Sequence, residues 1–213
     1  KKMEISVSLL FIENVLQLIG AFVVFSVAFI SYYGYNKTDS PTMLRLTIAF
    51  LLLGGGFSIS GISGLLDLNV QATSSLGLGS IIIVAASLEA AGYFFLAFSH
   101  MMNVKGISKM AAIPTFALAA IVPVTALKAI ALYFLVYGII ETGIAYIKLK
   151  KFETLAITLG LGLIASAEFI RWASFLYPTE SIILVSSLVI RVLGFITLFV
   201  PVVKFVSLGG KQI

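Results

Sequence analysis

The sequence predicts an all-α integral membrane protein, a bundle of seven transmembrane helices in one transmembrane domain, residues 1–213. Of the 213 residues, 60% are apolar and only 11% are charged. The mean hydropathy of +1.13 lies far above that of soluble domains. The apolar residues form runs of bilayer length over nearly all of these residues, so the chemistry of the protein must come from helices and short loops.

Seven apolar runs are long enough to cross a bilayer, and short polar or proline-containing breaks separate them. The runs cover residues 5–33, 43–66, 76–103, 107–125, 128–147, 153–177 and 181–208. The break between the fourth and fifth runs is the weakest, because only Pro123 and Lys128 interrupt the apolar sequence there. A kink at this point would leave six spans, and that alternative stays open.

The distribution of lysine and arginine predicts the orientation. With seven spans, one side of the membrane carries Lys37, Arg45, Lys105, Lys109, Lys148, Lys150, Lys151, Lys204 and Lys211, and the other carries Lys1, Lys2 and Lys128. Because cytoplasmic loops are rich in basic residues, we expect the N-terminus outside the cell and the C-terminus in the cytoplasm. The expected location is the plasma membrane. The basic residues are scattered and lack interleaved aromatic residues, so we expect lipid headgroups as partners and no nucleic acid.

A parallel internal repeat is a further prediction, with residues 1–103 and 128–213 as three-helix halves and 104–127 as a linker helix. At one constant offset the matches are Tyr35 with Tyr146, Lys37 with Lys148, Leu44 with Leu155, Thr47 with Thr158 and Leu52 with Leu163. In the third and seventh helices the matches are Gly92 with Gly194, Tyr93 with Phe195 and Leu96 with Leu198.

This plan of three, one and three helices resembles that of SWEET-type sugar transporters and of microbial rhodopsins. The motifs of both families are absent, since no proline is followed by glutamine and Arg191 occupies the depth of the retinal-binding lysine. Retinal binding is therefore excluded. Residues 32–40, Tyr-Tyr-Gly-Tyr-Asn-Lys-Thr-Asp-Ser, resemble the first loop of small archaeal three-helix membrane proteins, a resemblance that implies no particular activity.

Six ionisable residues inside the predicted spans form the candidate functional site. They are Glu13, Glu89, Glu141, Glu168, Arg171 and Arg191. Each charge costs roughly 2.5–3.5 kcal/mol at the centre of a helix in the bilayer. We therefore expect these side chains to meet inside the bundle.

Two pairings follow from spacing and from the repeat. The repeat places Glu89 and Arg191 on equivalent positions, which predicts an ion pair across the interface of the two halves. Glu168 and Arg171 are three residues apart on one helix face and are predicted to pair there, with Glu13 close enough to join them. Glu141 has no evident cationic partner, so it either carries a proton or extends toward lysines at the end of its helix.

Composition excludes most chemistry. The chain has no cysteine and a single histidine, His100, and its serines have no histidine nearby, so we expect no catalytic residue, no metal site and no cofactor. The leading prediction is a non-catalytic accessory or scaffolding subunit that contacts other membrane subunits or a second copy of itself. The alternatives are a small proton- or ion-coupled transporter that uses the Glu/Arg network, and a membrane sensor without its own output domain. For the charges themselves three roles stay open: a purely structural network that fixes helix register, a path for an ion, proton or polar ligand, and contacts with another subunit.

Overall fold

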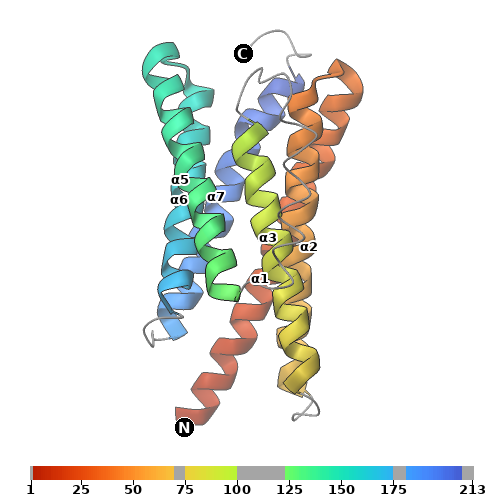
Figure 1. The fold of residues 1–213 in the computed structure, drawn as a ribbon, viewed down its shortest axis with the longest axis vertical. Helices are drawn as coiled ribbons and strands as arrows, with labels where there is room; N and C mark the ends of the chain where they lie inside the picture. Colours follow the sequence, from red (N-terminus) through yellow and green to blue (C-terminus); the bar gives the residue numbers. More distant parts are fainter. Residues whose placement is uncertain (1, 70–74, 100–122, 175–180, 208–213) are drawn as a thin grey trace.

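The computed structural model describes residues 2–69, 75–99, 123–174 and 181–207, which contain six α-helices and no strand (Figure 1). These helices are α1 (Lys2–Thr38), α2 (Pro41–Asn69), α3 (Ser75–Ser99), α5 (Val124–Leu149), α6 (Phe152–Ser174) and α7 (Ser181–Ser207). All six are long and apolar enough to cross a bilayer. Together with the composition, they identify a multi-pass membrane protein.

The six helices pack as a closed ring. α1 packs against α2 and α7, α3 packs against α2 and α5, and α6 packs against α5 and α7 (Figure 1). Each helix therefore has two principal neighbours, and its inner face points at a shared axis. The largest apolar side chains buried along this axis are Phe50, Leu53, Phe57, Tyr93, Leu96, Leu127, Leu135, Leu161, Ile164, Leu188 and Phe195.

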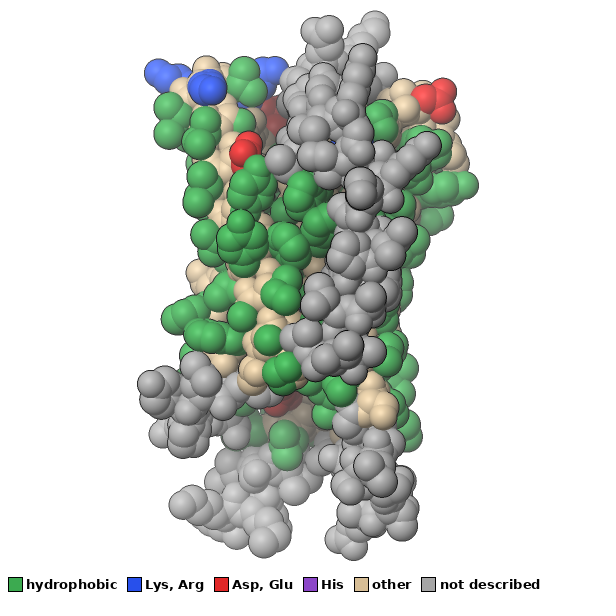
Figure 2. Space-filling model, viewed as in Figure 1, with side chains coloured by type: hydrophobic (Ala, Val, Ile, Leu, Met, Phe, Trp, Pro, Cys, Tyr) green, Lys and Arg blue, Asp and Glu red, His purple; other side chains and the backbone are tan. Residues whose placement is uncertain are grey.

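The outer face of the ring is apolar. Phe22, Phe29 and Ile147 each expose more than 70% of their surface, and Figure 2 shows hydrophobic side chains over most of the flank that is described. Lysine and arginine side chains gather at the end where α5 meets α6. An apolar flank with charges at an end is the surface that a bilayer requires.

Two tight turns join neighbouring helices at this end of the ring. Asp39 ends α1 with a left-handed φ of 49°, and its backbone N–H donates to the Tyr35 carbonyl at 2.8 Å. Lys150 ends α5 in the same way, with φ of 51° and a 2.7 Å bond to the Tyr146 carbonyl. A left-handed residue after the last helical turn is a common way to end a helix, and here neither residue is glycine.

Glycines set the closest helix contacts. A Cβ on Gly92 of α3 would lie 3.0 Å from the Ala49 carbonyl oxygen of α2. A Cβ on Gly194 of α7 would lie 2.9 Å from the Gly160 carbonyl oxygen of α6. The α2–α3 and α6–α7 pairs therefore approach until backbone meets backbone, as small residues allow in membranes.

Six of the seven predicted spans correspond to described helices. Five of them agree with the helix bounds to within a few residues, and the sixth, 5–33, is shorter than α1 at both ends. The fourth predicted span, 107–125, falls mostly within residues 100–122 and so lies outside the described residues. Seven helices, the repeat and the orientation remain predictions. The assignment of Lys128 to an outer loop is wrong, because Lys128 lies inside α5 and is only 6% exposed.

We expect Gly194→Ala to destabilise the protein. The added methyl group would press on the backbone of α6, and overpacking of this kind typically costs about 1–3 kcal/mol of unfolding free energy. Thermal unfolding of the purified protein in detergent measures the change. Gly162→Ala is the matched control on α6, since a Cβ there meets nothing within 4 Å. That control should be neutral or slightly stabilising, and an equal loss in both variants would contradict the close contact.

Candidate functional site

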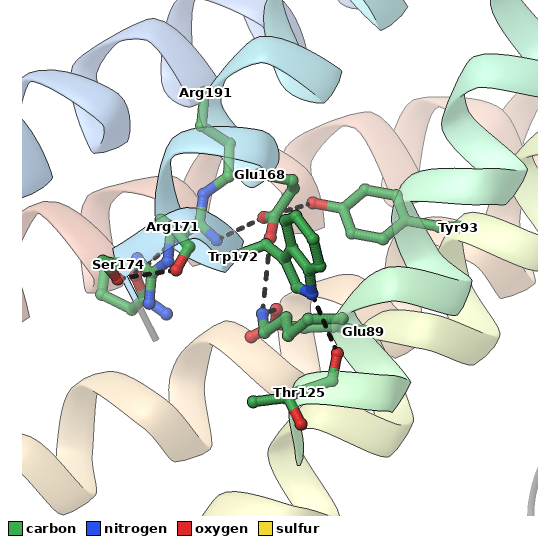
Figure 3. A network of polar contacts seen from close by, with 10 residues as sticks. Glu89, Tyr93, Thr125, Glu168, Arg171, Trp172, Ser174 and Arg191 are labelled. Carbon is green, nitrogen blue, oxygen red and sulfur yellow. Dashed lines mark hydrogen bonds and ion pairs between the residues drawn. The ribbon is translucent and has the colours of Figure 1, made fainter. Parts of the chain in front are cut away.

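Four charged side chains are buried together inside the ring. Glu89, Lys128, Glu168 and Arg191 are each at most 6% exposed, and they come from α3, α5, α6 and α7 (Figure 3). They contribute two negative and two positive charges. The group is therefore neutral as a whole, which is the condition for burying ions in hydrocarbon.

Glu168 lies at the centre of this group. Its Oε1 accepts hydrogen bonds from Arg191 Nη1 at 3.0 Å and from the Tyr93 hydroxyl at 2.9 Å. Its Oε2 lies 3.5 Å from Lys128 Nζ. Figure 3 shows Tyr93 and Arg191 approaching the Glu168 carboxylate from different helices. One carboxylate thus fixes the relative depth of α3, α5, α6 and α7.

Lys128 extends the network to α3. Its Nζ forms an ion pair with Glu89 Oε2 and also faces Glu168, so one ammonium group lies between two carboxylates. Gly56 on α2 allows the Glu89 side chain this position, because a Cβ on Gly56 would lie within 2.9 Å of both Glu89 Cγ and the Ala85 carbonyl oxygen. The start of α5 is held in turn by Trp172, whose Nε1 donates to the Thr125 carbonyl at 3.2 Å (Figure 3).

Gln17 of α1 and Phe57 of α2 complete the site around Arg191. Gln17 Oε1 accepts a hydrogen bond from Arg191 Nη2 at 2.5 Å and another from Arg171 Nη1 at 3.2 Å. The Arg191 guanidinium also lies over the Phe57 ring, with Cζ 4.0 Å from its centroid. Every described helix of the ring therefore contributes to the buried charge network of Gln17, Phe57, Glu89, Tyr93, Lys128, Glu168, Arg171 and Arg191.

The structure brings together Glu89, Glu168 and Arg191, as predicted, but not in the predicted pairs. Among the described residues Glu89 forms its ion pair with Lys128, and Arg191 forms its ion pair with Glu168. The predicted Glu168–Arg171 pair is also absent from the described ion pairs, because Arg171 donates to Gln17. The rotation of each helix about its own axis decides these choices, and sequence spacing does not fix it.

Two predicted site residues lie outside the network. Glu13 is half-buried on α1 and forms no ion pair with any described residue. Glu141 is exposed on α5 and accepts a 2.9 Å hydrogen bond from the Tyr137 hydroxyl one turn earlier. No described lysine is within ion-pair distance of Glu141, so its predicted extension toward Lys148 or Lys150 is not seen.

Sequence reasoning missed four network residues, namely Gln17, Phe57, Tyr93 and Lys128. Lys128 was placed at the break between the fourth and fifth runs, because Pro123 and Lys128 were the only interruptions of the apolar sequence there, although the apolar residues after Val124 already permit a helix. Gln17 and Tyr93 are neutral, so a search for charges in apolar runs passes over them. A search for any strong hydrogen-bonding side chain within the spans would have included Gln17.

A cavity of about 380 Å³ opens inside the ring on the side of the α1–α2 and α5–α6 turns. Its lining comes from α2, α3, α5, α6 and α7, and includes Phe50, Leu96, Thr142, Thr154 and Leu198. Glu141 and Glu153 add two carboxylates to an otherwise mostly apolar and hydroxyl-bearing wall. Glu153 is paired with Lys204.

The cavity and the network occupy different depths of the same axis. On α7, Leu198 lines the cavity, Phe195 lies one turn lower and Arg191 lies one turn lower again. On α3, Leu96 lines the cavity, and Tyr93 and Glu89 follow in the same order. A layer of packed aromatic rings, in which Phe195 contacts Phe50 and Phe57 at centroid distances of 6.4 and 5.6 Å, separates the two regions.

Within the described part of the chain, no three His, Cys, Asp or Glu side chains gather as a metal site would require. No nucleophile in the network has a histidine beside it among the described residues. The arrangement binds helices together and presents fixed charges; the predicted absence of catalysis, metal and cofactor stays a prediction.

Comparison with known proteins gives no family model, no curated protein and no solved structure that matches this chain. Function is therefore inferred from the geometry of the network and the cavity.

We expect Glu168→Gln to be the most destabilising single change in the network. It leaves Arg191 and Lys128 with only Glu89 to balance them in a low-dielectric interior, and breaking a buried pair costs about 3–5 kcal/mol of unfolding free energy. Tyr93→Phe removes one hydrogen bond to the same carboxylate and should cost about 1.5–3 kcal/mol, because the acceptor is charged. Denaturant titration in detergent micelles measures both.

The control for these variants is Glu153→Gln, which breaks the more exposed ion pair with Lys204. Solvent screens such pairs, so stability should hardly change. If Glu168→Gln were as mild as Glu153→Gln, the buried charge network would not hold the ring together.

Proposed function

We propose that this protein is a small carrier for a polar solute or ion, built from two similar three-helix halves, α1–α3 and α5–α7, in a three plus one plus three plan. The single observation that carries the proposal is the position of the cavity. It lies between the two halves, toward the α1–α2 and α5–α6 turns, while the buried charge network lies toward the other end of the ring. A carrier caught with one side open has this arrangement.

The two turns at the open end support the duplication. Asp39 and Lys150 are separated by 111 residues, and so are their hydrogen-bond acceptors Tyr35 and Tyr146. In both turns one residue has a left-handed backbone conformation, and its N–H donates a hydrogen bond to the carbonyl four residues earlier. The offset is the one at which the two halves of the sequence match.

The close glycine contacts repeat at the same spacing. Gly92 of α3 meets Ala49 of α2, and Gly194 of α7 meets Gly160 of α6. Ala49 and Gly160 are 111 positions apart, which is the offset of the matches between Tyr35 and Leu52. Gly92 and Gly194 are 102 positions apart, which is the offset of the sequence matches between α3 and α7. The close backbone contact is therefore made at equivalent positions in both halves.

Contacts between the halves also come in equivalent pairs. Gln17 of α1 bonds Arg191 of α7, and Lys128 of α5 bonds Glu89 of α3. At the two offsets, Gln17 is equivalent to Lys128 and Arg191 is equivalent to Glu89. These contacts are related by the approximate twofold relation that a parallel duplication predicts.

Contacts between the halves near the central axis of the ring also come in equivalent pairs. The Tyr93 hydroxyl of the first half bonds Glu168 of the second, and Phe195 of the second half packs on Phe57 of the first. Tyr93 is equivalent to Phe195, and Phe57 is equivalent to Glu168. Four independent sets of contacts thus agree with one pair of offsets.

The division of charge between the halves suggests how transport is coupled. Lys128, Glu168 and Arg191 all belong to the second half and keep one another as partners if the halves move apart. Glu89 belongs to the first half and would lose its one described ion-pair partner. In an opened state Glu89 therefore needs a proton or a cation, which makes it the candidate coupling group.

Orientation follows from the basic residues around the open end. Lys148, Lys150 and Lys151 lie at the α5–α6 turn, and Lys204 lies near the end of α7. We place this end in the cytoplasm by the positive-inside rule, so the cavity opens inward and the network faces the outside of the plasma membrane.

Alternating access is testable with single cysteines, because the chain contains none. We expect Thr142→Cys, in the cavity, to react with a membrane-impermeant maleimide from the cytoplasmic side of vesicles. Ser187→Cys, fully buried one turn below Arg191, should react slowly from the outside, because a carrier must open there. In a variant that carries both substitutions, prior labelling of the cavity thiol with a bulky reagent should suppress the outer reaction.

The control is Lys148→Cys, which should react fully from one side and report the orientation of the vesicles. If Ser187→Cys stays unreactive from both sides at every time point, the network never opens and the carrier proposal fails.

An accessory subunit remains a second candidate, and Glu141 favours it. This carboxylate is exposed on α5 within the span, next to Ile140 and about two helical turns from Tyr133, which are 56% and 67% exposed. Glu141 also lines the cavity, and a carboxylate inside a membrane span is expensive wherever it lacks a charged or strongly donating partner. A neighbouring membrane helix that donates a hydrogen bond would remove this cost.

For the subunit function we expect Glu141→Leu to lose a stoichiometric partner that co-purifies with the wild-type protein in mild detergent. The adjacent Ile140→Leu variant should retain that partner. A monodisperse wild-type monomer, free of any second protein, would count against the subunit function and leave the carrier as the proposal.

A further inference from the structure

The cavity between the halves combines an apolar wall with two carboxylates. Phe50 of α2, Leu96 of α3 and Leu198 of α7 belong to the apolar part of the lining. The carboxylates, Glu141 and Glu153, come from the adjacent helices α5 and α6. A volume of about 380 Å³, a mostly apolar wall and a few polar groups are typical of a site for a small organic molecule.

The polar groups of the lining act mainly as hydrogen-bond acceptors. A carboxylate has acceptor oxygens only. The hydroxyl of Ser99 donates its one proton to the Leu96 carbonyl at 2.7 Å, and that of Thr142 donates to the Gly138 carbonyl at 2.8 Å. Because these protons are used within α3 and α5, the two hydroxyl oxygens can only accept from a ligand. The remaining hydroxyl groups of the lining can accept as well.

The lining supplies no strong donor and one unbalanced charge. Among the described residues that form it there is no lysine, arginine, histidine, amide or indole side chain. Glu153 is paired with Lys204, which is not part of the lining. Glu141 accepts a 2.9 Å hydrogen bond from the neutral Tyr137 and forms no ion pair with any described residue. The matching ligand therefore carries N–H donors and a positive charge.

We propose that the cavity binds a small organic cation, a primary ammonium group on an apolar body. The ammonium group lies beside Glu141, and the body packs against Phe50, Leu96 and Leu198. An ammonium group has three donors and one positive charge, which the acceptors and the unbalanced carboxylate require. Water would satisfy the acceptors but would neither balance Glu141 nor cover the apolar wall, and a hydrated inorganic cation would leave that wall in contact with water.

Such a ligand touches both halves of the ring. Phe50 and Leu96 belong to the first half, and Glu141 belongs to the second. It also gives Glu141 a charged partner without a second protein. As the substrate class of the carrier, this cation rests on the proposed function, but its binding can be measured without transport.

The test measures the protection of a cysteine in the lining. Ala145→Cys places a thiol there, and a methanethiosulfonate reagent, which does not modify amines, reports its reactivity in lipid nanodiscs. At constant ionic strength we expect hexylammonium to slow this reaction in a saturable manner. Hexanol and hexanoate share the apolar body without the positive charge, and potassium has the charge without the body. None of these three should protect the thiol at the same concentration.

Two variants and one control thiol connect the protection to Glu141. Glu141→Gln removes the charge but keeps an oxygen that can accept from Tyr137, so the fold should be retained. It should raise the half-protecting concentration of hexylammonium at least tenfold, about 1.4 kcal/mol. Glu13→Gln makes the same change on α1, outside the lining, and should leave the protection unchanged. Lys148→Cys, at the α5–α6 turn, should react equally with and without hexylammonium.

Equal protection by hexanol would overturn the proposal, and so would protection that Glu141→Gln leaves intact. Stronger protection by hexanoate would overturn it as well and would assign the cavity to anions. Failure of the cation site and failure of the carrier give different results. If Ser187→Cys reacts from the outside but hexylammonium does not protect Ala145→Cys, the cation proposal fails and the carrier stands. If hexylammonium protects Ala145→Cys but Ser187→Cys never reacts, the cation site stands and the carrier fails.

Discussion

The ring depends on the Glu168 carboxylate and the two cations that hold it. In hydrocarbon a lone carboxylate or guanidinium is too expensive to keep, so Glu168, Arg191 and Lys128 must remain together once their helices are inserted. Because these residues lie on α6, α7 and α5, their contact fixes the depth and rotation of three helices at once. Tyr93 and the Glu89–Lys128 pair then fix α3 to the same centre. The buried charges therefore determine where the helices stand, and the aromatic core fills the space that remains.

Packing alone would not select this arrangement. Inside a bilayer, lipid tails and leucine side chains are equally apolar, so helices gain little from burying one more leucine. What they gain comes from close backbone approach and from satisfied polar groups. Both occur near one another here: Gly194 lets α7 meet α6 one turn away from Arg191, whose ion-pair partner Glu168 is on α6. Gly92 lets α3 meet α2 one turn away from Glu89, whose ion-pair partner Lys128 is on α5. Each glycine contact brings its helix near enough to the axis for the neighbouring charge to reach a partner.

The sequence was sufficient to predict the class of the fold, the positions of six helices, and the burial of Glu89, Glu168 and Arg191, because each of these follows from the cost of placing polar groups in hydrocarbon. It was not sufficient for the partners. Whether Glu89 meets Arg191 or Lys128 depends on how far each helix is rotated, and a rotation of one residue position changes the answer by about 100°. Lys128 was misassigned because its charge was taken, with Pro123, to mark a break between two spans, and Gln17 was overlooked because it carries no charge. The cavity was beyond prediction, since it is a space between α2, α3, α5, α6 and α7 that no single segment encodes.

In the proposed duplication, the equivalent positions near the axis are occupied by unlike residues, and this difference has a physical reason. A strict repeat would place two identical side chains close to the twofold axis, where two carboxylates or two guanidinium groups would repel each other in a low dielectric. In this chain Glu89 corresponds to Arg191, Gln17 to Lys128, and Phe57 to Glu168. The substitutions concentrate three of the four buried charges of the network in the second half and leave the first half with Glu89 and neutral groups. Separation of the halves would then break one ion pair between them, Lys128–Glu89, while the Glu168 pairs within the second half survive. A duplicated ring in which every carboxylate was paired with a cation of the other half would have to break every pair in order to open.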